Sequence, residues 1–384
     1  MKRICVVTGT RAEYGLLKPL LGQIKDRKDM ELQLVVTAMH LVPEFGLTVN
    51  TIIDDGFPIA KQVPCLDASD SALGVSKSVA KALSGLAEAF EDLQPDIVGI
   101  LGDRSEMLAA ATAATMASIP IAHIHGGETT EGAYDEAIRH AITKMSYWHF
   151  TATETYRKRV IQLGEHPDRV FNVGAIGLDS IMALDLLSQA DLERAIGFSL
   201  DGKTALVTYH PVTIGRDNPS QQFQKVLDAL EAEGQLRILF TYANSDKGGR
   251  AINEMIEAYV QAHPERSKAM PSLGQLRYLS ALQYVSMVVG NSSSGIIEVP
   301  YFNCPTINIG QRQKGRVMPK SVISVPCERS QIAAAVKQAQ DETFLKAIAK
   351  QEQLYGDGHA TAKIMAVLSS SSDINLQKPF YDLP

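Results

Sequence analysis

Five groups of polar residues each follow directly after a short apolar run, and their side chains are of kinds that bind phosphate or carry protons. Arginine and serine donate hydrogen bonds to phosphate oxygens, whereas aspartate, glutamate and histidine exchange protons. The groups are Thr10-Arg11, Asp103-Arg104, His125-Gly126-Gly127-Glu128, His210 and Asn291-Ser292-Ser293-Ser294-Gly295. Together they predict an enzyme that binds an anionic substrate and moves protons on it.

The serine-rich group has small side chains that let a phosphate approach free backbone N–H groups at a helix N-terminus. Ser292 and Ser293 add hydroxyl donors. Helix capping by Asn291 or a serine needs only one such residue, so the run favours anion binding. The lysine of a P-loop is missing. Glu298 lies at helical spacing from Ser294; it could accept two ribose hydroxyls or simply be solvated.

Arg11 and Arg312 are the cations best placed to pair with a diphosphate. Arg11 lies in the first turn of a predicted helix, where a cation opposes the helix dipole, which favours a functional role over a surface role. The stretch from Thr8 to Arg11 does not match GxGxxG, so we expect no dinucleotide cofactor.

Several of the candidate proton carriers also have simpler structural interpretations. Asp103 could cap the helix that follows it, and Asp135 and Glu136 could cap theirs. The two glycines after His125 are expected to expose backbone to a ligand. His123 and His125 are expected to share one face of a strand, which suits a metal, but no third ligand has recognisable spacing. We therefore predict no metal site.

Apolar runs that end in turn residues predict the strands that position these groups. They lie at 4–7, 32–36, 97–101, 119–124, 149–152 and 169–174, and again at 205–209, 236–240, 287–289 and 306–309. Helical spacing of apolar residues follows some of them, for example at 16–24 and 223–230. Two such series predict an α/β protein with two doubly wound, Rossmann-like domains, in which ligands bind beyond the carboxyl ends of the strands.

Composition excludes several classes of protein. The 384 residues are 45% hydrophobic and carry a net charge of −6, which excludes disordered, collagen-like and coiled-coil chains. A mild acidic excess gives no general attraction to nucleic acid or to anionic membranes, so we expect neither as a partner. The four cysteines form no CxxC pair, and the first apolar run is too short for a signal peptide. We therefore expect a cytoplasmic location.

Six motifs in order resemble the UDP-N-acetylglucosamine 2-epimerase family over nearly the whole chain. The likeness is greatest to the hydrolysing branch that serves bacterial nonulosonic (sialic or legionaminic) acid synthesis. The motifs are Thr8-Gly9-Thr10-Arg11-Ala12-Glu13-Tyr14, Gly102-Asp103-Arg104, His123-Ile124-His125-Gly126-Gly127-Glu128, Asp135-Glu136-Ala137-Ile138-Arg139-His140-Ala141-Ile142-Thr143-Lys144, His210-Pro211-Val212-Thr213 and Gly290-Asn291-Ser292-Ser293-Ser294-Gly295.

The resemblance implies a glycosyltransferase-B-like fold with UDP in an interdomain cleft. We expect an N-terminal domain at 1–174, joined by the C-terminal segment at about 365–384, and a UDP-binding domain at 175–364. Relatives form homodimers or homotetramers, so the resemblance also implies a homo-oligomer.

The resemblance implies roles for individual residues as well. UDP contacts are implied for Arg11, Ser292, Ser293, Gly295, Glu298 (ribose), Tyr278 (uracil) and Arg312, and sugar or phosphate contacts for Arg104 and Arg139. Catalytic positions are implied for Asp103, Asp135 and His210. The implied substrates are UDP-N-acetylglucosamine, which would give N-acetylmannosamine and UDP, or UDP-N,N′-diacetylbacillosamine. The implied chemistry needs no cofactor.

Two departures from the family pattern bear on mechanism. Sialic-type relatives often carry a glutamate where this chain has His125, so either His125 or Glu128 would supply that acid or base. Non-hydrolysing relatives carry a lysine shortly after the first arginine, and Tyr14-Gly15-Leu16-Leu17 here favours the hydrolysing branch. A glycosyltransferase of the same architecture and a non-catalytic UDP-sugar sensor are the alternatives from other functional classes.

Overall fold

The computed structural model divides the chain into two compact units. Unit 1 comprises Met1–Ala183 and Tyr355–Pro384, and unit 2 comprises Leu184–Leu354. The structure describes residues 1–67, 69, 71–129, 131, 134–200, 203–211, 218–243, 248–370 and 374–384. From the sequence we expected the chain to pass between the domains at about residues 174 and 365. In the structure, unit 1 extends further at both points: it includes α7 (Asp179–Ala183) and the residues from Tyr355 up to α15 (Ala360–Ser370).

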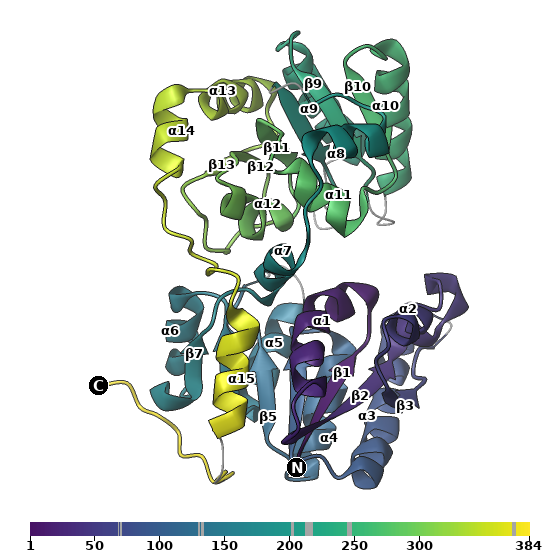
Figure 1. The fold of residues 1–384 in the computed structure, drawn as a ribbon, viewed down its shortest axis with the longest axis vertical. Helices are drawn as coiled ribbons and strands as arrows, with labels where there is room; N and C mark the ends of the chain where they lie inside the picture. Colours follow the sequence, from purple (N-terminus) through teal and green to yellow (C-terminus); the bar gives the residue numbers. More distant parts are fainter. Residues whose placement is uncertain are drawn as a thin grey trace. The chain divides into compact units, whose positions relative to one another are not determined.

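Unit 1 is built on a fully parallel seven-stranded sheet in the order β3-β2-β1-β4-β5-β6-β7 (Figure 1). Its strands are β1 (Lys2–Thr8), β2 (Met30–Thr37), β3 (Ile59–Val63), β4 (Ile97–Leu101), β5 (Ile121–Ile124), β6 (Trp148–Thr151) and β7 (Val170–Asn172). The central strand β4 is an unbroken apolar run that is buried throughout. Such a run is what a parallel strand covered by helices on both faces requires.

Helices cover both faces of this sheet. They are α1 (Arg11–Lys25), α2 (Val49–Asp54), α3 (Ala72–Leu93), α4 (Ser105–Met116), α5 (Asp135–Met145), α6 (Glu154–Gln162), α7 (Asp179–Ala183) and α15 (Ala360–Ser370), with 3-10 turns at Ala38–Leu41, Pro43–Phe45, Pro167–Arg169 and Ile176–Leu178. Helix α15 returns from the far end of the chain and packs beside α1, where Ile364 and Leu368 join the core (Figure 1). Asp179 caps α15 by accepting the backbone N–H groups of Ala360 and Thr361.

Unit 2 repeats the design with a parallel six-stranded sheet in the order β10-β9-β8-β11-β12-β13. Its strands are β8 (Thr204–Thr208), β9 (Arg237–Thr241), β10 (Ser267–Met270), β11 (Met287–Gly290), β12 (Thr306–Ile309) and β13 (Val322–Val325). Its helices are α8 (Gln189–Ile196), α9 (Pro219–Glu231), α10 (Gly249–Ala262), α11 (Gly274–Ala281), α12 (Ser294–Ile297), α13 (Arg329–Ala339) and α14 (Glu342–Ile348), with a 3-10 turn at Val299–Phe302. The predicted fold of two Rossmann-like domains is therefore confirmed.

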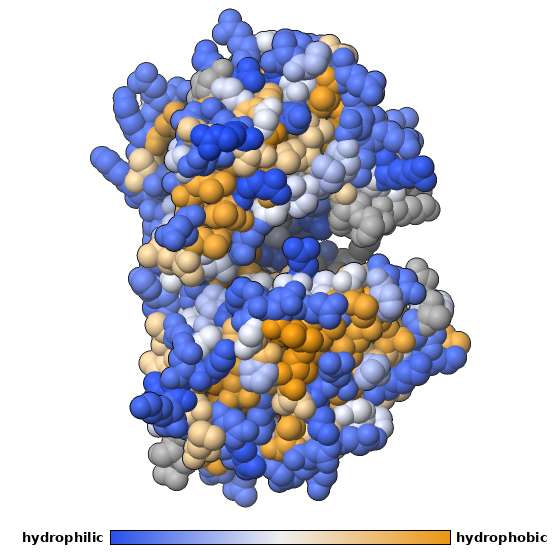
Figure 2. Space-filling view, turned by 45° about the vertical axis from the view of Figure 1, so that its right-hand side comes forward, coloured by the Kyte–Doolittle hydropathy of each residue, from blue (hydrophilic) through white to orange (hydrophobic). Residues whose placement is uncertain are grey.

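The three strands that the sequence did not reveal, β3, β10 and β13, all lie at sheet edges. All four cysteines are free thiols. No helix among the described residues is both long and apolar enough to cross a bilayer. On the visible face of unit 1, the lower body in Figure 2, hydrophobic residues gather into a broad surface area.

Candidate functional site

The predicted residues of unit 1 come from loops that follow three neighbouring strands, β1, β4 and β5. Because these strands are parallel, their carboxyl ends meet at one edge of the sheet, and the loops lie side by side there. The first loop leads into α1, the second into α4 and the third into α5. This edge of unit 1 is the candidate catalytic site.

Asp103 forms an ion pair with Arg139, which is buried on α5. Arg139 also contacts Glu136, with 3.2 Å between its Nη1 and the Glu136 Oε2. The residue at the N-cap of α4 is Arg104, so Asp103 does not cap that helix. The simpler interpretation of Asp103 as a capping residue is therefore wrong. Its carboxylate belongs to a network of charges that joins the loop after β4 to helix α5.

Asp135 is the first residue of α5, and the N-cap position before it is Tyr134. Burial raises the pKa of Asp135 above its ordinary value, while Arg104 and Arg139 oppose that shift. Partial desolvation and two nearby cations thus act on this carboxyl group in opposite directions.

A second pair of carboxyl groups lies beside Arg104. Glu106 Oε1 is 2.7 Å from Arg104 Nε, and Glu13 Oε1 is 3.9 Å from the same nitrogen. Both glutamates are buried. The Thr10 side chain and Glu13 also form a capping box at the start of α1. The Thr-x-x-Glu spacing was therefore readable in the sequence, although the approach of Glu106 was not.

His123 is a fully buried bridge and not a metal ligand in this arrangement. Its Nε2 is 2.8 Å from the carbonyl oxygen of Gly102, and its Nδ1 is 3.2 Å from the Thr143 hydroxyl. Since a carbonyl can only accept, Nε2 carries the proton. Burial lowers the pKa of His123 to about 3, so the ring is neutral. His123 thereby ties the loop that carries Asp103 to the helix that carries Arg139.

His125 accepts a hydrogen bond at one ring nitrogen and lies close to a carboxylate at the other. Its Nε2 accepts the backbone N–H of Ile176 at 3.2 Å, and its Nδ1 is 2.9 Å from Glu128 Oε1. An acceptor at Nε2 places the proton of a neutral ring on Nδ1, facing Glu128. Strand β5 ends before His125, whose φ of 67° is left-handed. The expectation that His123 and His125 share a strand face is therefore wrong.

The two glycines after His125 do not expose backbone to a ligand as predicted, because both are buried. A Cβ at Gly126 would lie 3.0 Å from His123 Nδ1 and 3.1 Å from Thr143 Oγ1. A Cβ at Gly127 would lie 2.6 Å from the carbonyl oxygen of Tyr156 on α6. These glycines allow the loop to pack closely against α5 and α6.

In unit 2, Asn291 joins the loop after β11 to the loop after β8, a link that the sequence analysis did not predict. Its side chain accepts the N–H of His210 and donates to the carbonyl of the same residue, both at 2.8 Å. The Asn291 carbonyl in turn accepts hydrogen bonds from Arg312 and from the buried Gln313. Asn291 is fully buried, and this positioning role was missed because the sequence offered only helix capping for it.

The serine group lies at the start of α12, which is only four residues long. A helix of one turn has little macrodipole, so the predicted field of a helix N-terminus is weak here. What remains for an anion is the serine hydroxyls and loop N–H groups. Gly295 is buried, and its carbonyl accepts the Thr306 hydroxyl at 2.7 Å. A Cβ at Gly295 would lie 2.7 Å from Thr306 Cγ2.

Two further UDP-binding candidates lie close to the serine group. The Tyr278 hydroxyl, from α11, is 2.7 Å from the Ser294 hydroxyl, and burial raises the pKa of Tyr278. Glu298 is half-buried at the C-terminal end of α12. Ser292 and Ser293 are half-buried in the turn between β11 and α12. The structure thus brings Tyr278, Glu298 and the serines to one end of the unit 2 sheet.

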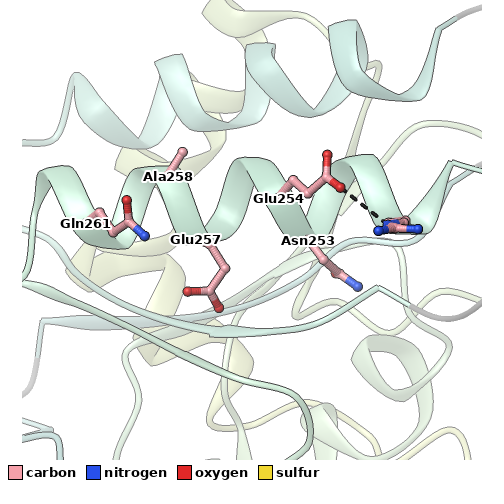
Figure 3. Close-up of a pocket in the computed structure, with 6 residues that line it drawn as sticks. Asn253, Glu254, Glu257, Ala258 and Gln261 are labelled. Atoms are coloured by element: carbon pink, nitrogen blue, oxygen red, sulfur yellow. Dashed lines mark ion pairs between the residues drawn. The ribbon is translucent and has the colours of Figure 1, made fainter.

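Arg11 is exposed at the first position of α1, and Arg312 is exposed after β12. Val212 and Thr213, which belong to the His210 motif, lie outside the described residues. Two surface hollows contain none of the predicted site residues. One lies along the exposed face of α10, where Glu254 pairs with Arg250 (Figure 3), and the other is lined by Glu154, Arg157, Pro167, Val170, Phe171, Asn172, Val173, Lys363 and Val367.

The amino-acid sequence is similar to those of known enzymes. A hydrolysing GDP/UDP-N,N′-diacetylbacillosamine 2-epimerase from Campylobacter jejuni is 44% identical over 322 residues, which are 84% of each chain. A hydrolysing UDP-N,N′-diacetylbacillosamine 2-epimerase from Legionella pneumophila is 38% identical over 370 residues, which are 96% of each chain.

A solved structure gives independent support for the fold. The UDP-GlcNAc 2-epimerase from Neisseria meningitidis, bound to UDP-GlcNAc, superposes with a TM-score of 0.81 at 18% identity, covering 97% of this chain and 100% of that one. A family model described as UDP-N-acetylglucosamine 2-epimerase matches residues 22–369. Because that match spans most of the sequence, the chain belongs to the UDP-N-acetylglucosamine 2-epimerase family.

Proposed function

We propose that this protein is a hydrolysing 2-epimerase that acts on a UDP-activated 2-acetamido sugar. The observation that carries the proposal is the 44% and 38% identity to two proteins named as hydrolysing 2-epimerases of such sugars. The acidic groups at the carboxyl edge of the unit 1 sheet support it, because the reaction needs two proton carriers and cations beside them.

The reaction balances without a cofactor. A base removes the proton from C2 while the bond between C1 and the diphosphate oxygen breaks, which releases UDP and leaves a C1–C2 double bond. Water then adds its hydroxyl at C1, and an acid delivers a proton to the opposite face of C2. The free sugar therefore leaves with C2 inverted.

Asp135 and Asp103 are our assignments for the two proton carriers. Burial raises the pKa of Asp135, which is the direction expected of a carboxyl group that must take up and release a proton during catalysis. Asp103 is held in place by Arg139. His125 and Glu128 form a further acid–base pair in which Glu128 faces the proton on Nδ1. His210 is assigned to the sugar side.

Binding of UDP is assigned mainly to unit 2. Ser292, Ser293 and Gly295 would contact the diphosphate, Glu298 the ribose, and Tyr278 the uracil. Arg11 and Arg312 would balance the charge of the diphosphate, and Arg104 and Arg139 would contact the sugar or a phosphate. Hydroxyl donors and guanidinium groups are the partners that phosphate oxygens prefer, which supports this assignment.

Two sugars are candidates for the substrate. The names of the two relatives favour UDP-N,N′-diacetylbacillosamine, whereas the description of the whole family favours UDP-N-acetylglucosamine. The presence of His125 in place of a glutamate is consistent with the first of these. Each is tested by comparing kcat/KM for UDP release from the two sugars, supplied separately.

An isotope experiment tests the reaction class. In D₂O, elimination followed by hydration places deuterium at C2 of the released sugar, and C1 takes its oxygen from water. A glycosyltransferase that hydrolyses its donor slowly leaves C2 unlabelled and uninverted, and a sensor releases no UDP. Absence of UDP release from both sugars, or release without deuterium at C2, would rule out the proposed function.

A cytoplasmic location and a homo-oligomeric state also remain proposals. Four free cysteines support a reducing compartment. The hydrophobic area on unit 1 supports association, because large apolar patches commonly mark interfaces (Figure 2). Light scattering of the purified protein tests the second proposal, which requires a mass above that of one chain.

A further inference from the structure

The β1–α1 loop and the first turn of α4 approach each other closely at Gly9. A Cβ at this position would lie 2.5 Å from Glu106 Oε1 and 2.9 Å from its Cγ. Only glycine leaves room for a buried glutamate to lie directly against the β1–α1 loop. The close approach brings the Glu106 carboxylate to the place where Glu13 and Arg104 also meet.

Glu13 has an asymmetric environment. Its Oε2 accepts two backbone N–H groups, from Gly9 at 2.9 Å and from Thr10 at 3.1 Å. Its Oε1 is buried and has no hydrogen-bond partner among the described residues. An oxygen in that position is suited to carry a proton, because a charged oxygen without a donor is costly to bury.

Glu106 has the opposite environment. Its Oε1 pairs with Arg104 Nε at 2.7 Å, and its Oε2 accepts the Ser105 hydroxyl at 3.2 Å. Both Glu106 oxygens therefore have a donor, in contrast to Glu13 Oε1. Two buried carboxyl groups therefore converge on a single guanidinium, and full ionisation of both would place two buried negative charges beside one cation.

The other ionisable groups that face this cluster come from three further segments. His40 and Cys65 lie near Glu106, and Asp135 lies near both Arg104 and Glu106. Burial lowers the pKa of His40 to about 4 and raises that of Cys65. Neither His40 nor Cys65 changes its charge near neutral pH, which leaves the carboxyl groups of the cluster, Asp135 among them, to respond there.

We propose that Glu13 and Glu106 share one proton at neutral pH, and that the shared proton keeps Arg104 available to the substrate diphosphate. Glu13 is then a positioning residue of the site, acting through Glu106 and Arg104. This inference rests on the proposed function, because it assumes that the substrate carries a diphosphate. Burial, followed by the neighbouring Glu106, raises the pKa of Glu13 to about 7, which agrees with the geometry.

The consequence is a pH-dependent affinity. With the proton in place, the charges of Glu106 and Arg104 cancel and Glu13 is neutral. When the proton leaves, an extra negative charge remains beside the arginine, and it both competes for Arg104 and repels the diphosphate. If only the protonated form binds well, KM rises about tenfold between about pH 6 and about pH 8. The diphosphate of the UDP-sugar is a diester and does not titrate in that range.

The test compares wild-type protein with Glu13→Gln. Glutamine still accepts the Gly9 and Thr10 N–H groups and offers its NH₂ to Glu106, so it imitates the protonated state permanently. We expect KM to remain near its low-pH value across the range. Glu106→Gln removes the charge that helps to raise the pKa of Glu13, so the rise in KM near neutral pH should disappear in this variant too, with a smaller change in kcat. Glu154→Gln, an exposed first-turn glutamate on α6, serves as the control and should behave as wild type.

A second measurement does not depend on turnover. Carbon NMR of glutamate-labelled full-length protein should show one carboxyl resonance that titrates near neutral pH, far above the ordinary value of about 4.3. That resonance should be absent from Glu13→Gln. A Glu13 midpoint below about 5, or equal pH dependence of KM in wild type and Glu13→Gln, overturns the inference. Failure of UDP release instead overturns the proposed function and leaves the NMR result to judge the proton pair.

Discussion

His123 and His125 are separated by one residue, yet their side chains have different environments. His123 is completely buried and holds a backbone carbonyl next to Asp103. His125 lies partly exposed and holds the chain at Ile176, near the point where unit 1 ends. The first is a neutral structural bridge, and the second links its loop to Ile176 and lies beside the Glu128 carboxylate.

The buried His123 makes folding sensitive to acid. Its pKa falls from 6.5 to about 3 on folding, so between these values the unfolded chain binds a proton that the folded chain does not. Stability therefore falls as pH decreases through this window, by up to about 1.4 kcal/mol per pH unit from this residue. His123→Gln, which can still donate to the Gly102 carbonyl, should show a shallower loss in urea unfolding. His166→Gln, at an exposed site, should keep the wild-type slope.

Asp135 gives the sharpest catalytic prediction. Asp135→Asn should retain UDP binding, because the side-chain volume hardly changes, but it should lower turnover by about 10²- to 10⁴-fold through loss of a proton carrier. Calorimetric titration with UDP and a UDP-release assay measure the two effects. Asp168→Asn, whose side chain is 87% exposed, is the matched control. Turnover within tenfold of wild type would remove Asp135 from the mechanism.

The order of the strands in each parallel sheet determines which loops lie close enough to contact each other. In unit 2, β8 and β11 are neighbours, and Asn291 after β11 reaches the loop after β8. Two hydrogen bonds from one side chain to one backbone residue fix both the position and the direction of that loop. The candidate His210 depends on this link.

Asn291→Ala should disturb this link in a measurable way. It leaves the N–H and carbonyl of His210 without their partner, which should lower the free energy of unfolding by about 2–4 kcal/mol. It should also weaken UDP binding, since the serine loop and the His210 loop lose their connection. Asn172→Ala, at an exposed site on β7, should change stability by less than about 0.5 kcal/mol. Equal stability of the two variants would mean that water replaces the amide.

The limits of sequence analysis also follow from position within the sheets. Buried central strands such as β4 read directly as apolar runs, whereas β3 (IAKQV) and β10 (SKAM) at the edges carry lysines and are only half-buried. The motif residues were recognisable because they follow strands. The Glu13–Glu106 approach, the His123 bridge and the inward packing of Gly126 depend on contacts between separate segments, and no local pattern encodes these.

The C-terminal segment of the chain is anchored to the rest of unit 1 by hydrogen bonds and an ion pair of Lys378. Lys378 donates to both carboxylate oxygens of the buried Glu165 and to the carbonyls of Lys144 and Ser146. His149 and Lys144 also contact Glu165, whose pKa these partners lower to about 2 against the effect of burial. The same segment places Phe380 against Gly164.

Loss of the Lys378 charge should loosen this segment. Lys378→Met keeps the apolar stem but removes the donors, so the free energy of unfolding should fall by about 1–3 kcal/mol. Limited proteolysis should then cut the last residues sooner than in wild type. Lys337→Met, at a site 73% exposed, provides the comparison. If the cleavage rates of both variants match wild type, the anchor does not hold the segment.

The position of helix α15 in the sequence determines which of the two units can complete its core first during synthesis. The helix completes the core beside α1, yet a ribosome makes it only after all of unit 2. Until then, the apolar residues that receive Ile364 and Leu368 stay uncovered, while unit 2 already has every strand of its own sheet. A chain that ends at residue 354 should therefore contain every strand of unit 2 but leave the core beside α1 incomplete.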